Sequence, residues 1–169
     1  STAAAMAMGD ALALALLERR GFKAEDFAAL HPGGALGRKL LLRVEDVMHV
    51  REAIPLVCEN DPMKAALIEM TTKRLGVTGV VTGQGELAGI ITDGDLRRGL
   101  EREKNLLALT AREVMTRSPK TIAREALAAQ ALQIMEQYAI TSLFIVSSSG
   151  RKTPEGIIHL HDLLKAGIA

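Results

Sequence analysis

The sequence predicts a protein of the α/β (α+β) class, built from two similar β-α-β-β-α units. The main observation is a repeated phrase: GIITDGDLRR at residues 89–98 returns as GIIHLHDLLK at residues 156–165, 67 positions later. Before each phrase lies a segment with apolar residues at helical spacing, followed by a short run rich in β-branched residues. Two copies are too few for a solenoid or a propeller, so the repeat predicts a pair of related units.

The composition excludes several classes of protein. Apolar residues make up 48% of the chain and aromatic residues 2%, with no tryptophan, so the core must be aliphatic. Few aromatic platforms are therefore present for base stacking, and the net charge of +1 gives no basic surface, so nucleic-acid binding is not expected. The single cysteine, Cys58, excludes an internal disulfide and fits a reducing cytoplasm.

The N-terminal run STAAAMAMGDALALALL is apolar but does not predict a membrane protein. It is short for a membrane span, is interrupted by Gly9 and Asp10, and lacks the basic leader of a signal peptide. We expect a helix from Asp10 to Arg20 that ends at Gly21 and is covered on all sides within a soluble protein. Because the chain starts at Ser1 rather than methionine, residues 1–43 are expected to be the tail of a domain whose body lies upstream.

The two repeated units are expected to span residues 44–107 and 108–169. EDVMHV at the start of the first matches REVMTR at the start of the second, 67 positions later. The spacing then drifts before the longer loop SSSGRKTPEG restores it: AALIEM (65–70) aligns with QALQIM (130–135) at 65 positions, and VTGVV (77–81) with ITSLF (140–144) at 63. Drift of this kind is typical of a duplicated structural unit.

Each unit is predicted to contain one helix before its strands and one after them. Asp61 is expected to cap the first helix, with Pro62 at its first helical position. Its apolar face is predicted to comprise Met63, Ala66, Leu67 and Met70, and that of the second unit Leu127, Ala131, Ile134, Met135 and Tyr138. Strands are expected at 77–82, 87–92, 140–146 and 156–159, and the last helices near Asp93 and His161.

The repeated phrase carries the candidate ligand-binding residues. Gly89 would allow close approach of a ligand, with Ile90 beside it, and Thr92 puts a hydroxyl at the end of the strand, where a helix N-terminus favours anions. Asp95 in the first helical turn can accept two hydrogen bonds from the hydroxyls of a ribose, and the adjacent Arg97 and Arg98 can pair with phosphate. The alternative is structural: Thr92 and Asp95 as ordinary capping residues and the arginines as a solvated face.

The two units resemble a tandem pair of CBS domains, the regulatory modules named after cystathionine β-synthase. The signature of that family is a glycine, an apolar residue, any residue, Ser or Thr, two more residues, then Asp. The first unit matches it from Gly89 to Asp95, and the second at Gly156, Ile157, Ile158 and Asp162. The resemblance covers about residues 45–169 and implies ligand clefts between the units. It further implies that Asp95 holds ribose and Thr92 phosphate, with base pockets lined by Val77, Thr78, Ile140 and Thr141.

The second unit departs from the signature at His159, where the family has Ser or Thr. His159 is bulkier than threonine, and it is the residue type that titrates near neutral pH. We therefore expect two unequal half-sites, with the one at Thr92 and Asp95 the better nucleotide site. His159, His161 and Asp162 also suggest a metal site, for which the sequence shows no fourth ligand. A hydrogen-bonded turn is the alternative that we favour, so no metal or cofactor is expected.

The first 43 residues resemble the end of the sugar isomerase (SIS) domain in D-arabinose 5-phosphate isomerases of the bacterial Kdo pathway. The similar segment reads TAAAMAMGDALALALLERRGF, followed by HPGGALGRKLLLRVEDVM. In that family two CBS units follow this segment, and the resemblance implies that His31 belongs to the active site. Ser1 and Thr2 would be the remnant of a sugar-phosphate loop. The other catalytic residues would lie upstream of Ser1, so the chain alone is expected to lack isomerase activity.

The resemblance implies a regulatory, nucleotide-sensing pair attached to an enzyme that interconverts ribulose 5-phosphate and arabinose 5-phosphate. The expected ligands are AMP or ATP, or the activated product of the pathway, CMP-Kdo. The parent enzyme would act on a sugar phosphate as a tetramer, through a homodimer of CBS pairs. The alternative is a structural module that drives oligomerisation and binds no ligand.

Overall fold

The computed structural model describes residues 2–22, 26, 41–102, 105–147 and 150–168. The chain divides into two compact parts, residues 1–42 and 43–169, which are described separately. The predicted residue His31 lies outside the described residues. In the described part of the chain, no helix has the length and apolar character needed to cross a membrane.

The described portion of the first part is mainly one helix, α1 (Thr2–Arg19), and none of its residues is buried. The predicted start at Asp10 is wrong, because the helix begins eight residues earlier, at Thr2. The alanine-rich opening has a high helix propensity, and a single glycine costs only about 1 kcal/mol within a helix. The predicted end is confirmed by Gly21, whose φ of +63° stops the helix.

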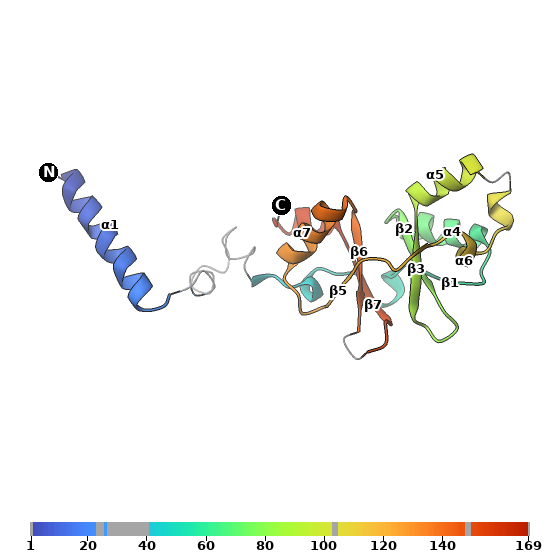
Figure 1. Ribbon diagram of the computed structural model, residues 1–169, viewed down its shortest axis with the longest axis horizontal. Helices are drawn as coiled ribbons and strands as arrows, with labels where there is room; N and C mark the ends of the chain where they lie inside the picture. The colour runs from blue at the N-terminus through green and yellow to red at the C-terminus, as the bar shows by residue number, and fades with distance from the viewer. Residues whose placement is uncertain (1, 23–25, 27–40, 103–104, 148–149, 169) are drawn as a thin grey trace. The chain divides into compact units, whose positions relative to one another are not determined.

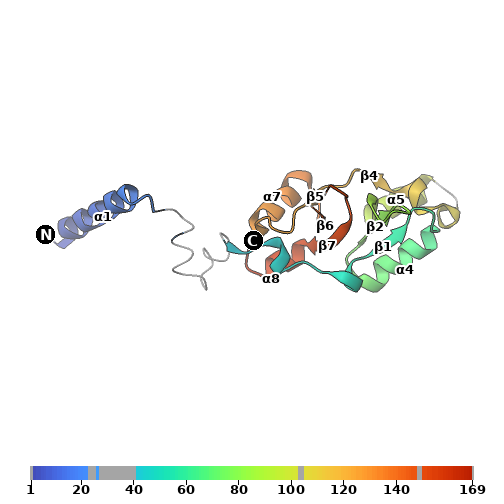
Figure 2. The ribbon, with the colours of Figure 1, turned by 90° about the horizontal axis from the view of Figure 1, so that it is seen from below.

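The second part begins with the first repeated unit, which follows the predicted order of strand, helix, strand, strand and helix (Figure 1). Its elements are β1 (Leu56–Cys58), α4 (Met63–Lys73), β2 (Val77–Val81), β3 (Leu87–Thr92) and α5 (Asp93–Arg102). Strand β2 lies parallel to β1 and antiparallel to β3. Helix α4 packs beside β1, as Figure 2 shows, and connects these two parallel strands.

The second unit repeats this order and topology. Its elements are β5 (Thr121–Ile122), α7 (Ala128–Tyr138), β6 (Ser142–Val146), β7 (Pro154–His159) and α8 (Leu160–Lys165). Strand β6 again lies parallel to the strand before the helix and antiparallel to the strand after it. The predicted tandem pair of β-α-β-β-α units is therefore confirmed.

The opening segment of each unit crosses to the sheet of the other unit. In the second unit this segment contains α6 (Ala111–Val114) and β4 (Thr116–Arg117), and β4 pairs with β3 of the first unit. In the first unit the segment contains a 3-10 helix, η1 (Val44–Asp46), and His49 pairs with Ile157 in β7. In Figure 1 the cyan segment after residue 43 lies beside the orange second unit, and the yellow α6 lies within the green first unit.

A methionine on each crossing segment packs directly against a glycine of the opposite sheet. A Cβ built on Gly89 would lie 2.7 Å from Met115 Sδ and 2.8 Å from the carbonyl oxygen of Thr116. A Cβ on Gly156 would lie 2.8 Å from Met48 Sδ and 3.0 Å from the carbonyl oxygen of His49. The sequence correctly indicated close approach at Gly89, but what approaches is the crossing segment of the protein itself.

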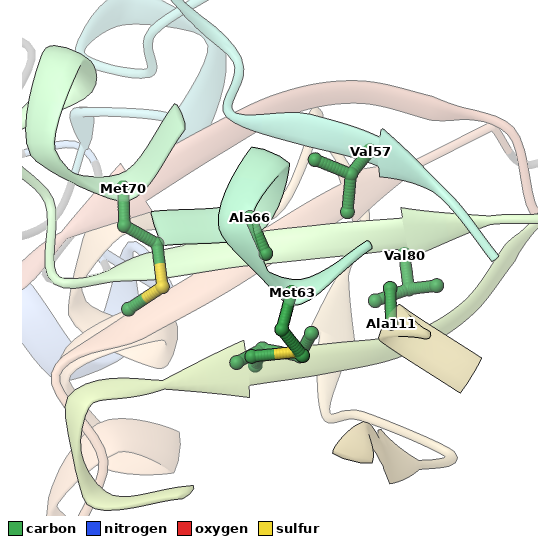
Figure 3. Close-up of a cluster of buried hydrophobic side chains, with 7 residues drawn as sticks. Val57, Met63, Ala66, Met70, Val80 and Ala111 are labelled. Atoms are coloured by element: carbon green, nitrogen blue, oxygen red, sulfur yellow. The ribbon is translucent and has the colours of Figure 1, made fainter. Parts of the chain in front are cut away.

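The core of the first unit includes a residue from the crossing segment. Figure 3 shows Met63, Ala66 and Met70 of α4 packing toward β1 and β2, with Ala111 of α6 closing the cluster. Ala111 is completely buried, as is Val44 on the other crossing segment. Each unit therefore depends on residues contributed by its partner repeat.

A second apolar cluster joins the two sheets. Val77 and Leu87 of the first sheet pack with Phe144 and Ile157 of the second, together with Ile54. Gly79 permits this contact, because a Cβ there would lie 2.9 Å from the Phe144 ring. This cluster holds the two sheets together beside the region where the candidate ligand-binding residues lie.

Two helix details differ from the sequence prediction. Asp61 does not cap α4; its carboxylate instead accepts a hydrogen bond from the Cys58 backbone N–H at 2.8 Å, which closes the turn after β1. Tyr138 does not belong to the buried face of α7, because it lies in the last turn and is 45% exposed.

We expect Gly89→Ala and Gly156→Ala each to lower the free energy of unfolding by about 1–3 kcal/mol, because the added methyl would overlap a methionine and a backbone carbonyl. Gly83→Ala is the control, since a Cβ there meets nothing within 4 Å. Urea denaturation followed by circular dichroism measures all three. Equal stability of the Gly89 and Gly83 variants would contradict the close packing.

We also expect neither repeat to fold alone, because a fragment covering residues 43–107 lacks Ala111 and β4. A fragment covering residues 108–168 lacks Val44 and the segment that pairs with Ile157. Mixing the two fragments should restore the sheets by mass action. Circular dichroism and proton NMR of each fragment and of the mixture test this, and cooperative unfolding of either isolated fragment would contradict it.

Candidate ligand-binding site

The two units enclose a cleft of about 810 Å³, which is within the range of small-molecule sites. Its walls are the turn between α4 and β2, the junction of β3 and α5, the segment after β4, and the turn between α7 and β6. The lining includes four cationic side chains, Arg74, Arg97, Arg98 and Lys120, and one carboxylate, that of Asp93. This balance of charge favours an anionic ligand.

The strand pairing corrects the predicted alignment of the two halves. Val77 lies opposite Thr92, and Ser142 lies opposite His159. Since Thr92 and His159 occupy the same place in the repeat, Val77 corresponds to Ser142, at a spacing of 65 rather than 63. The predicted pairing of Val77 with Ile140 is therefore wrong. Equivalent residues of α4 and α7 are 65 positions apart, and those of β2 and β6 are also 65 apart. The spacing returns to 67 in the loop before β7, which is two residues longer than the loop before β3.

In the first half-site, Thr92 and Asp95 form a tight hydrogen-bonded turn where β3 meets α5. The Asp95 Oδ2 atom accepts hydrogen bonds from the Thr92 backbone N–H at 2.9 Å and from the Thr92 hydroxyl at 2.7 Å. The Asp95 backbone N–H donates back to the Thr92 Oγ1 atom at 3.2 Å. The capping role of these residues is thus real, and it holds the threonine at the edge of the cleft.

The other oxygen of Asp95 connects the turn to its surroundings. Asp95 Oδ1 accepts hydrogen bonds from Arg98 Nη2 at 2.8 Å and from the Thr116 hydroxyl at 3.1 Å. Burial raises the pKa of the Asp95 carboxyl, but the hydrogen bonds from Thr92, Arg98 and Thr116 outweigh it and hold the pKa below its ordinary value. The carboxylate is therefore ionised and fully paired before any ligand binds.

The second half-site repeats this geometry with histidines. Asp162 Oδ2 accepts hydrogen bonds from the His159 backbone N–H at 3.0 Å and from His49 Nε2 at 2.9 Å. His49 follows Met48 on the crossing segment, just as Thr116 follows Met115. The His161 backbone N–H donates to His159 Nδ1 at 3.1 Å, so His159 caps α8 through its ring.

The hydrogen-bonded turn is thus the arrangement found at His159, His161 and Asp162. Among the described residues, no group of three or more His, Cys, Asp and Glu side chains is placed to hold a metal ion. Burial lowers the pKa of His159; the nearby Asp162 opposes this shift, and His161 and His49 add to it. The ring is therefore neutral near pH 7.

The cleft brings together many of the predicted ligand-binding residues. Those that line it are Val77, Ile90, Thr92, Arg97, Arg98, Ile140, Thr141 and His159. Thr78 is buried, and Gly89 is covered by Met115. Asp162 accepts a hydrogen bond from the His159 backbone N–H and is not among the residues that line the cleft. Asp95 faces a smaller adjoining hollow of about 410 Å³, with Arg98 and Thr116 forming the wall between the two spaces.

Several lining residues were not predicted from the sequence. They include Arg74, Thr116, Ser118, Lys120, Tyr138 and Ser142. Arg74 has a left-handed φ of 58° at the end of α4, and Ala139 repeats this conformation at the end of α7. Had the sequences been aligned at a spacing of 65 through the strands, Ser142 would have been identified as the counterpart of the predicted lining residue Val77. No sequence signal indicated Lys120, whose Nζ atom lies 4.1 Å from the centre of the Tyr138 ring.

Comparison with known proteins agrees with this architecture. Residues 44–102 and 111–169 each match the CBS domain family. The chain is 54% identical over 168 residues to arabinose 5-phosphate isomerase KdsD of Pseudomonas aeruginosa, covering 99% of the chain and 51% of the relative. It is 46% identical to KdsD of Escherichia coli K12, covering 99% of the chain and 50% of that protein. The chain thus spans about half the length of the curated relatives it matches.

Solved structures show the same fold at lower identity. CBSX2, crystallised in complex with AMP, superposes with a TM-score of 0.65 at 20% identity, covering 75% of this chain and 96% of the other. The CBS pair of MJ0100, in complex with 5-methylthioadenosine and S-adenosyl-L-methionine, gives a TM-score of 0.64 at 22% identity, covering 73% and 93%. With its crossed repeats and its two family matches, the chain belongs to the CBS domain family, as a tandem pair similar to that of the arabinose 5-phosphate isomerases.

Proposed function

We propose that the CBS pair binds an anionic nucleotide in the cleft between its repeats and thereby regulates an arabinose 5-phosphate isomerase. The observation that carries this proposal is the first half-site, where Thr92 and Asp95 adjoin a cleft lined by four cationic side chains. Two proteins of the same fold, CBSX2 and MJ0100, were crystallised with adenosine ligands. The candidate ligands are AMP, ATP and CMP-Kdo.

Binding would exchange hydrogen bonds at Asp95. A ribose has two neighbouring hydroxyls, which can replace Arg98 and Thr116 as donors to the Asp95 carboxylate. Arg98, once released, would join Arg97 in pairing with phosphate, and Thr92 would supply its hydroxyl. The apolar side chains of Val77 and Ile140 would contact the base. The paired state of Asp95 thus keeps a buried carboxylate satisfied until a ligand arrives.

The exchange gives a route by which the cleft can act on the rest of the protein. Thr116 lies on a crossing segment, so replacing its hydrogen bond to Asp95 alters the attachment of that segment to the first sheet. The other crossing segment begins at Val44, directly after the linker from the preceding part. Residues 32–46 would transmit the occupancy of the cleft to the sugar isomerase domain.

The proposal extends to the whole protein. The parent enzyme would interconvert ribulose 5-phosphate and arabinose 5-phosphate in the cytoplasm, for Kdo and lipopolysaccharide biosynthesis. His31 would serve its active site, and the enzyme would be a tetramer built through homodimers of CBS pairs. The isomerase relatives supply the basis for this extension, since the chain matches them over 99% of its length.

A structural module that only drives oligomerisation is the second candidate. Exposed apolar side chains on the helices favour it: Ile68 of α4 is 58% exposed, Leu100 of α5 is 67% exposed and Leu164 of α8 is 50% exposed. Such residues are suited to a contact between CBS pairs. The two candidates differ in whether the cleft binds a ligand.

We expect Thr92→Val and Asp95→Asn to weaken nucleotide binding at least tenfold, a loss of about 1.4 kcal/mol, because each removes hydrogen bonding from the first half-site. Thr92→Ser retains the hydroxyl and should retain affinity. Thr71→Ala is the control, since its hydroxyl bonds within α4 to the Leu67 carbonyl, away from the cleft. Calorimetric titration with AMP, ATP and CMP-Kdo measures the effect. If none of them binds below millimolar concentration, the sensor is disproved.

We expect the same two variants to keep their state of assembly while losing their response to ligand. Light scattering after size-exclusion chromatography gives the assembly state. In the full-length isomerase, the rate of arabinose 5-phosphate conversion with and without ligand gives the response. A pure oligomerisation module would show no response to ligand in the unmodified protein.

A further inference from the structure

The second half-site contains a pair of polar side chains that the first half-site lacks. Ser142 in β6 lies directly opposite His159 in β7, so both side chains project from the same face of the sheet, and both line the cleft. The corresponding pair in the first unit is Val77 and Thr92. The polar pair is therefore a feature of the second unit and not a requirement of the repeated fold.

The Ser142 hydroxyl has no hydrogen-bond partner. Its Oγ atom is buried, and it is the one buried side-chain oxygen or nitrogen without a partner among the described residues. An unsatisfied buried hydroxyl destabilises a protein, and most such groups in native structures are paired. The same position in the first unit holds valine, so an apolar side chain fits the fold there. The hydroxyl is therefore costly for folding, and no group of the described residues competes with a ligand for its hydrogen bonds.

The His159 ring has a fixed tautomer. Its Nδ1 atom accepts the His161 backbone N–H, so the proton of the neutral ring lies on Nε2. No described residue forms a hydrogen bond with that Nε2 atom. His159 thus presents an N–H donor where the first unit presents the Thr92 hydroxyl, which is already engaged with Asp95.

We propose that Ser142 and His159 form an oxyanion subsite, which binds a phosphate or carboxylate group at the end of the ligand remote from Thr92. This inference rests on the proposed function, because the same ligand would occupy the first half-site. One ligand with at least two anionic groups would then span the cleft, at one molecule per chain. The Asp162 carboxylate accepts hydrogen bonds from His49 and from the His159 backbone N–H, and in the described part of the chain it forms none with the Ser142 hydroxyl or with His159 Nε2.

The electrostatic setting of the cleft as a whole supports an anion. Lys120 lines it beside Tyr138, which lies in the last turn of α7 before Ser142, and Arg74 lines it from the first unit. Asp93 is the one carboxylate among the described lining residues. Two neutral donors with cations nearby bind an oxyanion without the cost of burying another full charge. Burial lowers the pKa of His159, so the ring stays neutral near pH 7 and keeps the hydrogen bond from the His161 backbone that sets its tautomer.

The test compares ligands that differ in one anionic group. Calorimetry is performed with two pairs of probes: AMP and ATP, which differ in phosphate, and CMP and CMP-Kdo, which differ in a carboxylate sugar. The variants are Ser142→Ala and His159→Thr, with His159→Gln as a conservative replacement that keeps a donor near the Nε2 position. His161→Ala is the matched control, because its contribution to the tautomer comes from its backbone N–H.

We expect Ser142→Ala and His159→Thr to weaken ATP or CMP-Kdo at least tenfold while changing AMP and CMP less than twofold. The pair of probes that responds identifies the subsite as one for phosphate or for carboxylate. His159→Gln should recover part of the loss, and His161→Ala should match the unmodified chain. Ser142→Ala should leave the melting temperature unchanged or higher, because it removes an unpaired buried hydroxyl.

The outcomes separate this inference from the proposed function. If nucleotides bind and Thr92→Val weakens them, but Ser142→Ala and His159→Thr affect both members of each pair equally or not at all, the subsite is disproved and the sensor stands. A proton on His159 Nδ1, detected by nitrogen-15 NMR of the imidazole, would also overturn it. If no nucleotide binds, both proposals fall.

Discussion

The contact on which the CBS pair depends is the packing of a methionine of one repeat against a glycine of the other. Met115 lies over Gly89 and Met48 over Gly156, at distances that leave no room for a side chain on either glycine. Because the two contacts are reciprocal, neither sheet is complete without the other repeat. Ala111 and Val44, which precede the methionines, are completely buried by the same crossing. The burial of Ala111 and Val44, the completion of each sheet edge and the pairing of the two repeats thus all follow from the crossing of the opening segments.

The candidate site is a further consequence of the crossing. The residue after each methionine reaches the aspartate of the opposite unit: Thr116 donates to Asp95, and His49 donates to Asp162. Each half-site is therefore made by both repeats, even before a ligand is considered. Asp95 is therefore hydrogen-bonded to a segment that belongs to the other unit in sequence. The proposed regulatory role rests on such connections between the two repeats.

The sequence was sufficient for the order of elements and for the capping turn at Thr92 and Asp95, because those features depend on local patterns. The spacing of apolar residues located α4 and α7, and the Thr-x-x-Asp pattern located a real turn at Thr92. The crossing of the opening segments was not predictable from the sequence. Each segment could pack on its own sheet or on the sheet of the other unit, because both sheets carry an equivalent glycine, Gly89 or Gly156. The predicted alignment of VTG (77–79) with ITS (140–142), 63 positions apart, was wrong because it matched the threonines of the two segments. The strand pairing shows that equivalent residues are 65 positions apart, as in the preceding helices. Ser142 was missed for that reason.

The surface charges favour the crossed arrangement over one in which each repeat folds back on itself. In the crossed arrangement Arg112 pairs with Glu59 at 3.2 Å, and Glu45 pairs with Arg124 at 3.0 Å. These four residues occupy two equivalent positions of the repeat, with the charges reversed between the copies. If each opening segment returned to its own unit, Glu45 would face Glu59 and Arg112 would face Arg124. Each pair at the surface contributes less than about 1 kcal/mol, but repulsion in place of attraction at both positions disfavours the uncrossed alternative. The two glycines are equivalent in the repeat, but the charges beside them differ in sign, and this difference favours the observed crossing.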